Sequence, residues 1–198
     1  MRYVSISGAV GLALMAASCT QAPTPQQIAE RGRYLVIVMG CTDCHTPGAL
    51  TGMPDRTKFL GGSDVSFFMP GMGFFYPPNL TPDPTGLGAW TPQQIVAAIR
   101  TGVRPDGRKL VPMMPWADFA SLTDDDANAI ATYLKGIPAV MKQVPAPTAA
   151  DAVPPGPSMA VVAPPGMTPV GYNTPPPPPA PPTPPAPARG RGGRAPGR

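Results

Sequence analysis

The pentapeptide Cys41-Thr42-Asp43-Cys44-His45 has the pattern C-x-x-C-H, and it decides how the rest of the chain is interpreted. In covalent haem attachment, two thiols at this spacing add across the two vinyl groups of the macrocycle, and the adjacent histidine reaches the iron from one face. The two-residue gap brings both sulfurs near one edge of the ring while the backbone turns His45 beneath it. The motif therefore predicts one haem c, attached through Cys41 and Cys44, with His45 as an iron ligand.

Two other kinds of site also use a pair of cysteines at this spacing. A thioredoxin-like redox pair is expected within a βαβ unit, which the flanking sequence does not contain. A zinc site needs four ligands. His45 is the one histidine of the chain, and the third cysteine, Cys19, lies in an apolar N-terminal segment. Haem attachment is therefore the favoured interpretation.

The second axial ligand of the iron is expected to be a methionine, because no second histidine exists. The candidates after the motif are Met53, Met69, Met72, Met113 and Met114. The last two lie in a proline-stiffened stretch, residues 111–116, just before the last predicted helix. Position in the sequence favours this pair without choosing between its members.

Three helices are predicted from their first residues. The sequence TPQQI occurs twice, at 24–28 and 91–95, and each copy offers an N-cap hydroxyl, a proline at the first helical position and a glutamine three residues after the cap. The residues after the two copies differ, so we interpret the repeat as one capping solution used twice. The second helix is expected to stop near Gly102, and a third helix runs from Thr123 to before Gly136.

The stretch between the first two helices, residues 46–90, is rich in Gly and Pro, and an irregular segment of this length is uncommon in a compact domain. Its aromatics include Phe67, Phe68, Phe74, Phe75 and Tyr76. A large apolar cofactor would let such loops fold around it. The predicted fold is therefore all-α, with three main helices and long loops around a haem.

Composition divides the chain into three parts. Residues 1–22 are predicted to be an export signal, with one basic residue and then a short apolar run. Ala16-Ala17-Ser18-Cys19 resembles a lipobox, in which Cys19 would be lipidated and anchor the protein to a membrane; ordinary cleavage nearby is the alternative. Residues 23–142 form the predicted domain. Residues 143–198 are predicted to be a disordered, proline-rich tail that ends in Arg and Gly.

The net charge of +4 describes the ends of the chain rather than the domain. Residues 24–142 contain ten Lys and Arg against ten Asp and Glu, and four of the remaining arginines lie at the end of the tail. The basic balance therefore does not argue for nucleic-acid binding.

Further short segments match a known pattern in order over about residues 28–140. They are residues 30–35, 79–83, 86–91, 100–102, 106–108, 114–115 and 133–134. On these residues the chain resembles the monohaem class I cytochrome c domain, of the kind found as electron-transfer subunits or domains with alcohol and aldehyde dehydrogenases. Relatives that dock on dehydrogenases often carry three such domains in tandem, whereas this chain has a single C-x-x-C-H.

The resemblance implies a fold in which the first and last helices cross at Gly32 and Tyr133. It implies that the methionine directly before a proline is the axial ligand, which selects Met114 and leaves Met113 as the runner-up. It also places Asn79 and Trp90 in a haem-edge loop, although a turn and a core aromatic would explain these two residues equally well.

The motif and the resemblance together predict electron transfer by an exported, periplasmic protein that is not itself an enzyme. Expected partners are a dehydrogenase, a terminal oxidase, or both. A peroxidase-like haem enzyme and a haem-based sensor, each with an open sixth position on the iron, are the alternatives.

Overall fold

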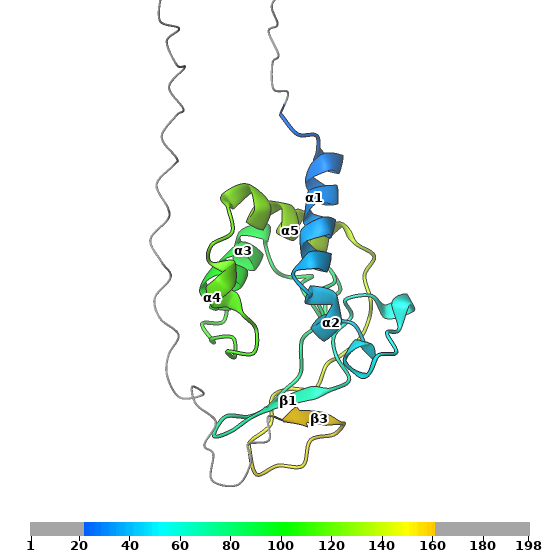
Figure 1. Ribbon diagram of the computed structural model, residues 1–198, viewed down its shortest axis with the longest axis vertical. Coiled ribbons are helices and arrows are strands. Elements are labelled where there is room, and N and C mark those ends of the chain that lie inside the picture. The colour runs from blue at the N-terminus through cyan, green and yellow to red at the C-terminus, as the bar shows by residue number, and fades with distance from the viewer. Residues whose placement is uncertain (1–21, 161–198) are drawn as a thin grey trace, which may run out of the picture.

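The structure is a computed structural model that describes residues 22–160, and Figure 1 shows how the elements are arranged. The three predicted helices are present as α1 (Pro25–Val38), α3 (Pro92–Thr101) and α5 (Asp124–Gly136). The shorter elements are α2 (Cys41–His45), η1 (Ala49–Thr51), η2 (Arg56–Lys58), β1 (Ser66–Met69), β2 (Gly73–Phe75), α4 (Trp116–Phe119) and β3 (Ser158–Ala160). Within residues 22–160, no helix is both long and apolar enough to cross a membrane.

Both copies of TPQQI begin a helix through the same set of hydrogen bonds. Gln27 N donates to Thr24 Oγ1 at 3.2 Å, and Thr24 N donates to Gln27 Oε1 at 2.8 Å. Thr91 and Gln94 form the equivalent pair at 3.2 and 2.9 Å. Each box satisfies amide donors that the first turn of a helix leaves without partners. The capping interpretation of the repeat is therefore confirmed.

The predicted crossing of the first and last helices is confirmed at Gly32. This residue is buried on α1, and a Cβ added to it would lie 2.8 Å from Cβ of Tyr133 and 2.6 Å from the carbonyl carbon of Ala129 on α5. A larger residue would hold the helices apart, so glycine permits the close backbone approach. Arg31 and Asp126 form an ion pair across the same crossing at 2.8 Å.

The core lies where α1, α3 and α5 meet. Its buried residues are Leu35, Val36, Leu60, Leu87, Ile95, Ile130, Ala131 and Leu134. The buried residues of α5 are Ala127, Ala129, Ile130, Ala131 and Leu134, which form a wide apolar face against α1 and α3. Leu60 and Leu87 belong to loops, so their burial in the core also holds the loop after η2 and the loop before α3 in place.

The all-α prediction is wrong in one respect, because the structure contains a three-stranded sheet with strand order β2-β1-β3. β1 pairs antiparallel with β2, with Phe67 opposite Phe75 and Phe68 opposite Phe74. The rings of Phe68 and Phe74 lie 4.8 Å apart. Aromatics that were expected to surround the cofactor therefore also stabilise a hairpin through cross-strand contacts.

The third strand comes from the segment assigned to the disordered tail. β3 pairs parallel with β1, and Ser66 N donates to the carbonyl of Pro157 at 3.0 Å. All three residues of β3 are exposed, so the strand has no alternation of apolar and polar residues that a sequence pattern could detect. The part of the tail up to residue 160 packs on the domain, whereas the lipidation of Cys19 and the rest of the tail lie outside the described residues.

Candidate haem-binding site

Helix α2 carries the C-x-x-C-H motif at the foot of α1 (Figure 1). The chain turns between the two helices at Gly40, whose φ of 71° is the left-handed conformation that glycine adopts without strain. Cys41 and Cys44 are half-buried and not bonded to each other. Because the two cysteines are three residues apart on a helical turn, their side chains lie on the same face of α2, which suits attachment to one edge of a macrocycle.

The thiol groups of the motif are kept protonated. Burial raises the pKa of Cys41 to about 11, with smaller contributions from Cys44 and Asp43. Burial and Asp43 also raise the pKa of Cys44. Cysteines of dithiol redox enzymes have lowered pKa values, so these electrostatics argue further against a thioredoxin-like pair.

The side chain of His45 is oriented by one hydrogen bond. The residue is 6% exposed, and Nδ1 lies 2.7 Å from the carbonyl oxygen of Pro78. A carbonyl oxygen can only accept, so Nδ1 carries the proton and Nε2 keeps its lone pair. Burial lowers the pKa of His45 to about 4, and the bond to Pro78 opposes this only in part. The imidazole is therefore neutral at neutral pH, with Nε2 available to a metal.

The two loops beside α2 fix the backbone around His45. Gly62 N donates to the carbonyl of His45 at 2.8 Å, and Leu60 N donates to Thr46 Oγ1 at 3.2 Å. Leu80 N in turn donates to the carbonyl of Leu60 at 2.8 Å, which ties the two loops to each other. Sequence reasoning missed these loop residues because they act through backbone atoms, which no residue pattern identifies.

Met113 and Met114 lie on the turn before α4, and both are half-buried. The loop that carries them is fixed at Gly102, where Leu110 N donates to the Gly102 carbonyl at 2.7 Å. A Cβ at Gly102 would also lie 2.6 Å from the ring of Trp116, so this ring packs directly on the glycine backbone. The structure thus anchors the loop at both ends and leaves the choice between the two methionines open.

Asn79 is 1% exposed, and both ends of its amide are used within the protein. Its Nδ2 donates to Thr85 Oγ1 at 3.0 Å, to the carbonyl of Val140 at 2.7 Å and to that of Lys142 at 3.5 Å. Its Oδ1 accepts from the amide and the hydroxyl of Thr81, at 2.9 and 2.8 Å. These bonds make Asn79 the centre of a buried polar network directly after Pro78.

Trp90 is half-buried and packs against the core. The guanidinium of Arg104 lies over its ring, 5.1 Å from the ring centroid. The Nε atom of Arg104 is buried and lies 3.5 Å from Asp106 Oδ2, but the two atoms are not aligned for a hydrogen bond. Sequence reasoning did not single out Arg104, although it stands in the segment that leads to the two methionines.

The donors at this site fit a covalently bound haem. One face of α2 offers two unbonded thiols, and the next residue offers a neutral imidazole whose Nδ1 is already engaged. Among residues 22–160 the Nε2 of His45 has no hydrogen-bond partner. Thioether sulfur, the remaining donor the iron would need, is present in the anchored loop before α4.

Comparison with known proteins agrees with this assignment. A family model described as "Cytochrome C oxidase, cbb3-type, subunit III" matches residues 27–134. The chain is 34% identical over 145 residues to the cytochrome c subunit of the quinone alcohol dehydrogenase of Gluconobacter oxydans, which covers 72% of this chain and 28% of that protein. It is 38% identical over 106 residues to the fructose dehydrogenase cytochrome subunit of Gluconobacter japonicus, covering 53% of this chain and 20% of that subunit.

A further relative is the cytochrome c subunit of gluconate 2-dehydrogenase from Pantoea cypripedii, 33% identical over 107 residues, or 54% of this chain and 22% of the subunit. The chain thus spans between a fifth and a third of the length of these curated relatives.

Proposed function

The chain belongs to the class I c-type cytochrome family, whose family model matches residues 27–134, and from that membership we propose that it transfers single electrons through one covalent haem. In this proposal Cys41 and Cys44 hold the haem, and His45 and Met114 are the axial ligands of its iron. The observation that carries the proposal is the orientation of His45, whose hydrogen bond to Pro78 fixes the tautomer that leaves Nε2 free. The bound haem would supply the one-electron couple of iron.

The protein's own residues adjust how readily the electron is accepted. The Pro78 carbonyl that accepts from Nδ1 would increase the basicity of Nε2 toward a bound iron, and a thioether ligand would favour the reduced state of that iron. Two strong axial ligands would also leave no position for a substrate. Met114 is preferred to Met113 because the family resemblance puts the ligand directly before a proline.

We further propose that the electron donor or acceptor is a dehydrogenase in the periplasm. The curated relatives reported above are bacterial and are named as cytochrome subunits of alcohol, fructose and gluconate dehydrogenases. Export through residues 1–22, lipidation of Cys19 and exchange of electrons with a terminal oxidase remain predictions from the sequence.

Optical spectroscopy of the haem-loaded protein tests the ligand assignment. We expect a low-spin, six-coordinate spectrum with a weak methionine-to-iron band, which Met114→Ala abolishes and Met113→Ala retains. Loss of the band in Met113→Ala alone would transfer the role to Met113. A high-spin wild-type spectrum that changes on addition of carbon monoxide would instead favour the peroxidase-like or sensor alternatives.

A further inference from the structure

After α5 the chain runs in an extended course past the loops that hold His45, and this segment descends to β3 (Figure 1). Alternate residues of the segment face those loops, as expected for extended chain. A Cβ on Gly61 would lie 2.8 Å from Val140, and one on Gly62 would meet Val144 more closely still. Between these two valines stands Lys142, whereas Met141 is 85% exposed.

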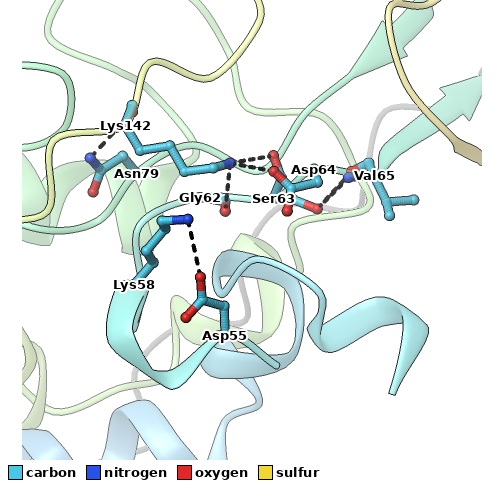
Figure 2. Close-up of polar contacts among 8 residues, drawn as sticks. All are labelled: Asp55, Lys58, Gly62, Ser63, Asp64, Val65, Asn79 and Lys142. Atoms are coloured by element: carbon cyan, nitrogen blue, oxygen red, sulfur yellow. Dashed lines mark hydrogen bonds and ion pairs between the residues drawn. The ribbon is translucent and has the colours of Figure 1, made fainter. Parts of the chain in front are cut away.

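The side chain of Lys142 is bound to the loop after η2, as Figure 2 shows. Its Nζ donates to the carbonyls of Gly62 and Ser63 at 3.3 and 3.2 Å and pairs with Asp64 Oδ1 at 2.8 Å. The lysine side chain is 17% exposed and that of Asp64 is 54% exposed. The ammonium group is therefore largely withdrawn from water, and two backbone carbonyls and one carboxylate accept its hydrogen bonds.

The backbone of Lys142 is bound to the other loop. Its amide donates to Thr85 Oγ1 at 3.2 Å, and its carbonyl accepts from Asn79 Nδ2 at 3.5 Å. One residue therefore joins the segment around Gly62 to the segment around Asn79.

These two segments are the ones that orient His45. Gly62, whose carbonyl accepts from Lys142, donates its amide to the His45 carbonyl at 2.8 Å. Pro78, next to Asn79, accepts from His45 Nδ1 at 2.7 Å. Ser63 N also donates to the carbonyl of Pro77 at 2.9 Å, so the two segments are bonded to each other beside the histidine.

We propose that Lys142 is a positioning residue for the axial ligand, acting by holding Gly62 and Pro78 in the places from which they fix the His45 ring. The inference rests on the proposed function, in which His45 binds the haem iron. Lys142 lies beyond residues 27–134, the part matched by the family model. Without the ammonium group, two loop carbonyls lose their donor, and the loop gains freedom next to the histidine.

The test is solvent exchange of the His45 Nδ1 proton, followed by NMR in the reduced, haem-loaded full chain. Lys142→Met keeps the apolar stem and removes the ammonium group, and we expect it to accelerate exchange at least tenfold. The amide of Ile130, buried in α5, is followed in the same sample as a measure of global opening. Lys142→Arg, which restores a charged donor, is expected to exchange at close to the wild-type rate.

Lys58→Met is the matched control. Lys58 pairs with Asp55 at 3.1 Å in a neighbouring turn, with its side chain 52% exposed (Figure 2). We expect this variant to leave the exchange of the His45 proton unchanged. Unchanged exchange in Lys142→Met, or an equal acceleration at Ile130, would overturn the inference. If the wild-type protein shows no Nδ1 proton shifted by the haem ring current, the assignment of His45 as a ligand fails instead, so the two failures are distinguishable.

Discussion

Replacement of Gly32 with alanine tests whether the crossing of α1 and α5 holds the domain together. The added methyl group would lie 2.6 Å from the carbonyl carbon of Ala129 and 2.8 Å from Cβ of Tyr133. Carbon atoms that are not bonded rest about 3.5–4.0 Å apart, so the two helices have to separate by roughly 1 Å. The neighbouring atoms belong to the backbone and to a Cβ of α5, and they cannot rotate away.

Two opposing contributions set the expected magnitude. Overpacking of this kind costs about 1–3 kcal/mol, and the rigid neighbours put this site near the upper end of that range. Alanine recovers about 1 kcal/mol of helix propensity relative to glycine. The net expectation is a loss of about 2 kcal/mol in the free energy of unfolding, a large fraction of the roughly 5–15 kcal/mol typical of a domain.

Urea unfolding of the haem-loaded protein, followed by far-ultraviolet circular dichroism, measures this difference. Gly136→Ala is the matched control, because Gly136 ends α5 and an added Cβ there meets no atom within 4 Å. We expect the control to be as stable as the wild type or up to about 1 kcal/mol more stable. The reasoning is refuted if Gly32→Ala unfolds at the same urea concentration as the control.

Three further substitutions test the polar contacts of the domain. Asn79→Ala removes the donor and the acceptor of the buried amide and should lower the free energy of unfolding by about 3 kcal/mol. Asn128 is exposed, so Asn128→Ala should change the free energy of unfolding far less. Equal losses for the two variants in urea unfolding would contradict this. Thr91→Ala removes the cap of α3 and should cost about 1 kcal/mol by the same assay, and no loss would show that the capping box is dispensable. The hydrogen bond from Arg31 holds the pKa of Asp126 below its ordinary value. The contribution of the ionised Asp126 to the free energy of unfolding is therefore fully present above the unfolded-state pKa near 4, and it is lost as the pH falls through the folded-state pKa. The stability difference between wild type and Asp126→Asn, measured by thermal unfolding from pH 7 to pH 2.5, should therefore shrink below about pH 4, and a difference that grows on acidification would contradict the sign.

The sequence was sufficient for the helical frame because its signals are local. A threonine, a proline and a glutamine at fixed spacing define a helix start whatever follows, and both copies of TPQQI were found as α1 and α3. The close approach at Gly32 followed from the resemblance, and the structure confirms it through the Cβ positions on α5.

The third strand could not be predicted, because its pairing with β1 is not local. The hairpin of β1 and β2 is local, and it was missed because its aromatics were assigned to the cofactor. β1 and β3 are separated by some ninety residues, and β3 is exposed on all three of its side chains. Proline-rich composition indicated a tail without structure, but the amides of Ser66 and Phe74 find carbonyl partners in Pro157 and Thr148. Pairing of this kind depends on backbone groups that every sequence possesses.

The candidate site also contains residues that the sequence predicted and residues that only the structure reveals. The roles of Cys41, Cys44 and His45 were predicted from their spacing alone, since the chemistry of attachment fixes it, and they stay predictions. Asn79 was expected at a haem-edge loop; the structure shows its amide bonded within a buried network, and its place at the haem edge stays a prediction. The roles of Pro78 and Lys142 depend on which carbonyl lies beside which donor, and only the folded chain shows this.

An optical redox titration of the purified full-length protein tests the central claim most directly. The account predicts one covalent haem that stays low-spin in both oxidation states. It also predicts a single one-electron Nernst wave toward the high end of the range for c-type haems, as expected for histidine and methionine ligation. A protein that releases its haem on denaturation, or that shows no reversible one-electron wave, would contradict it.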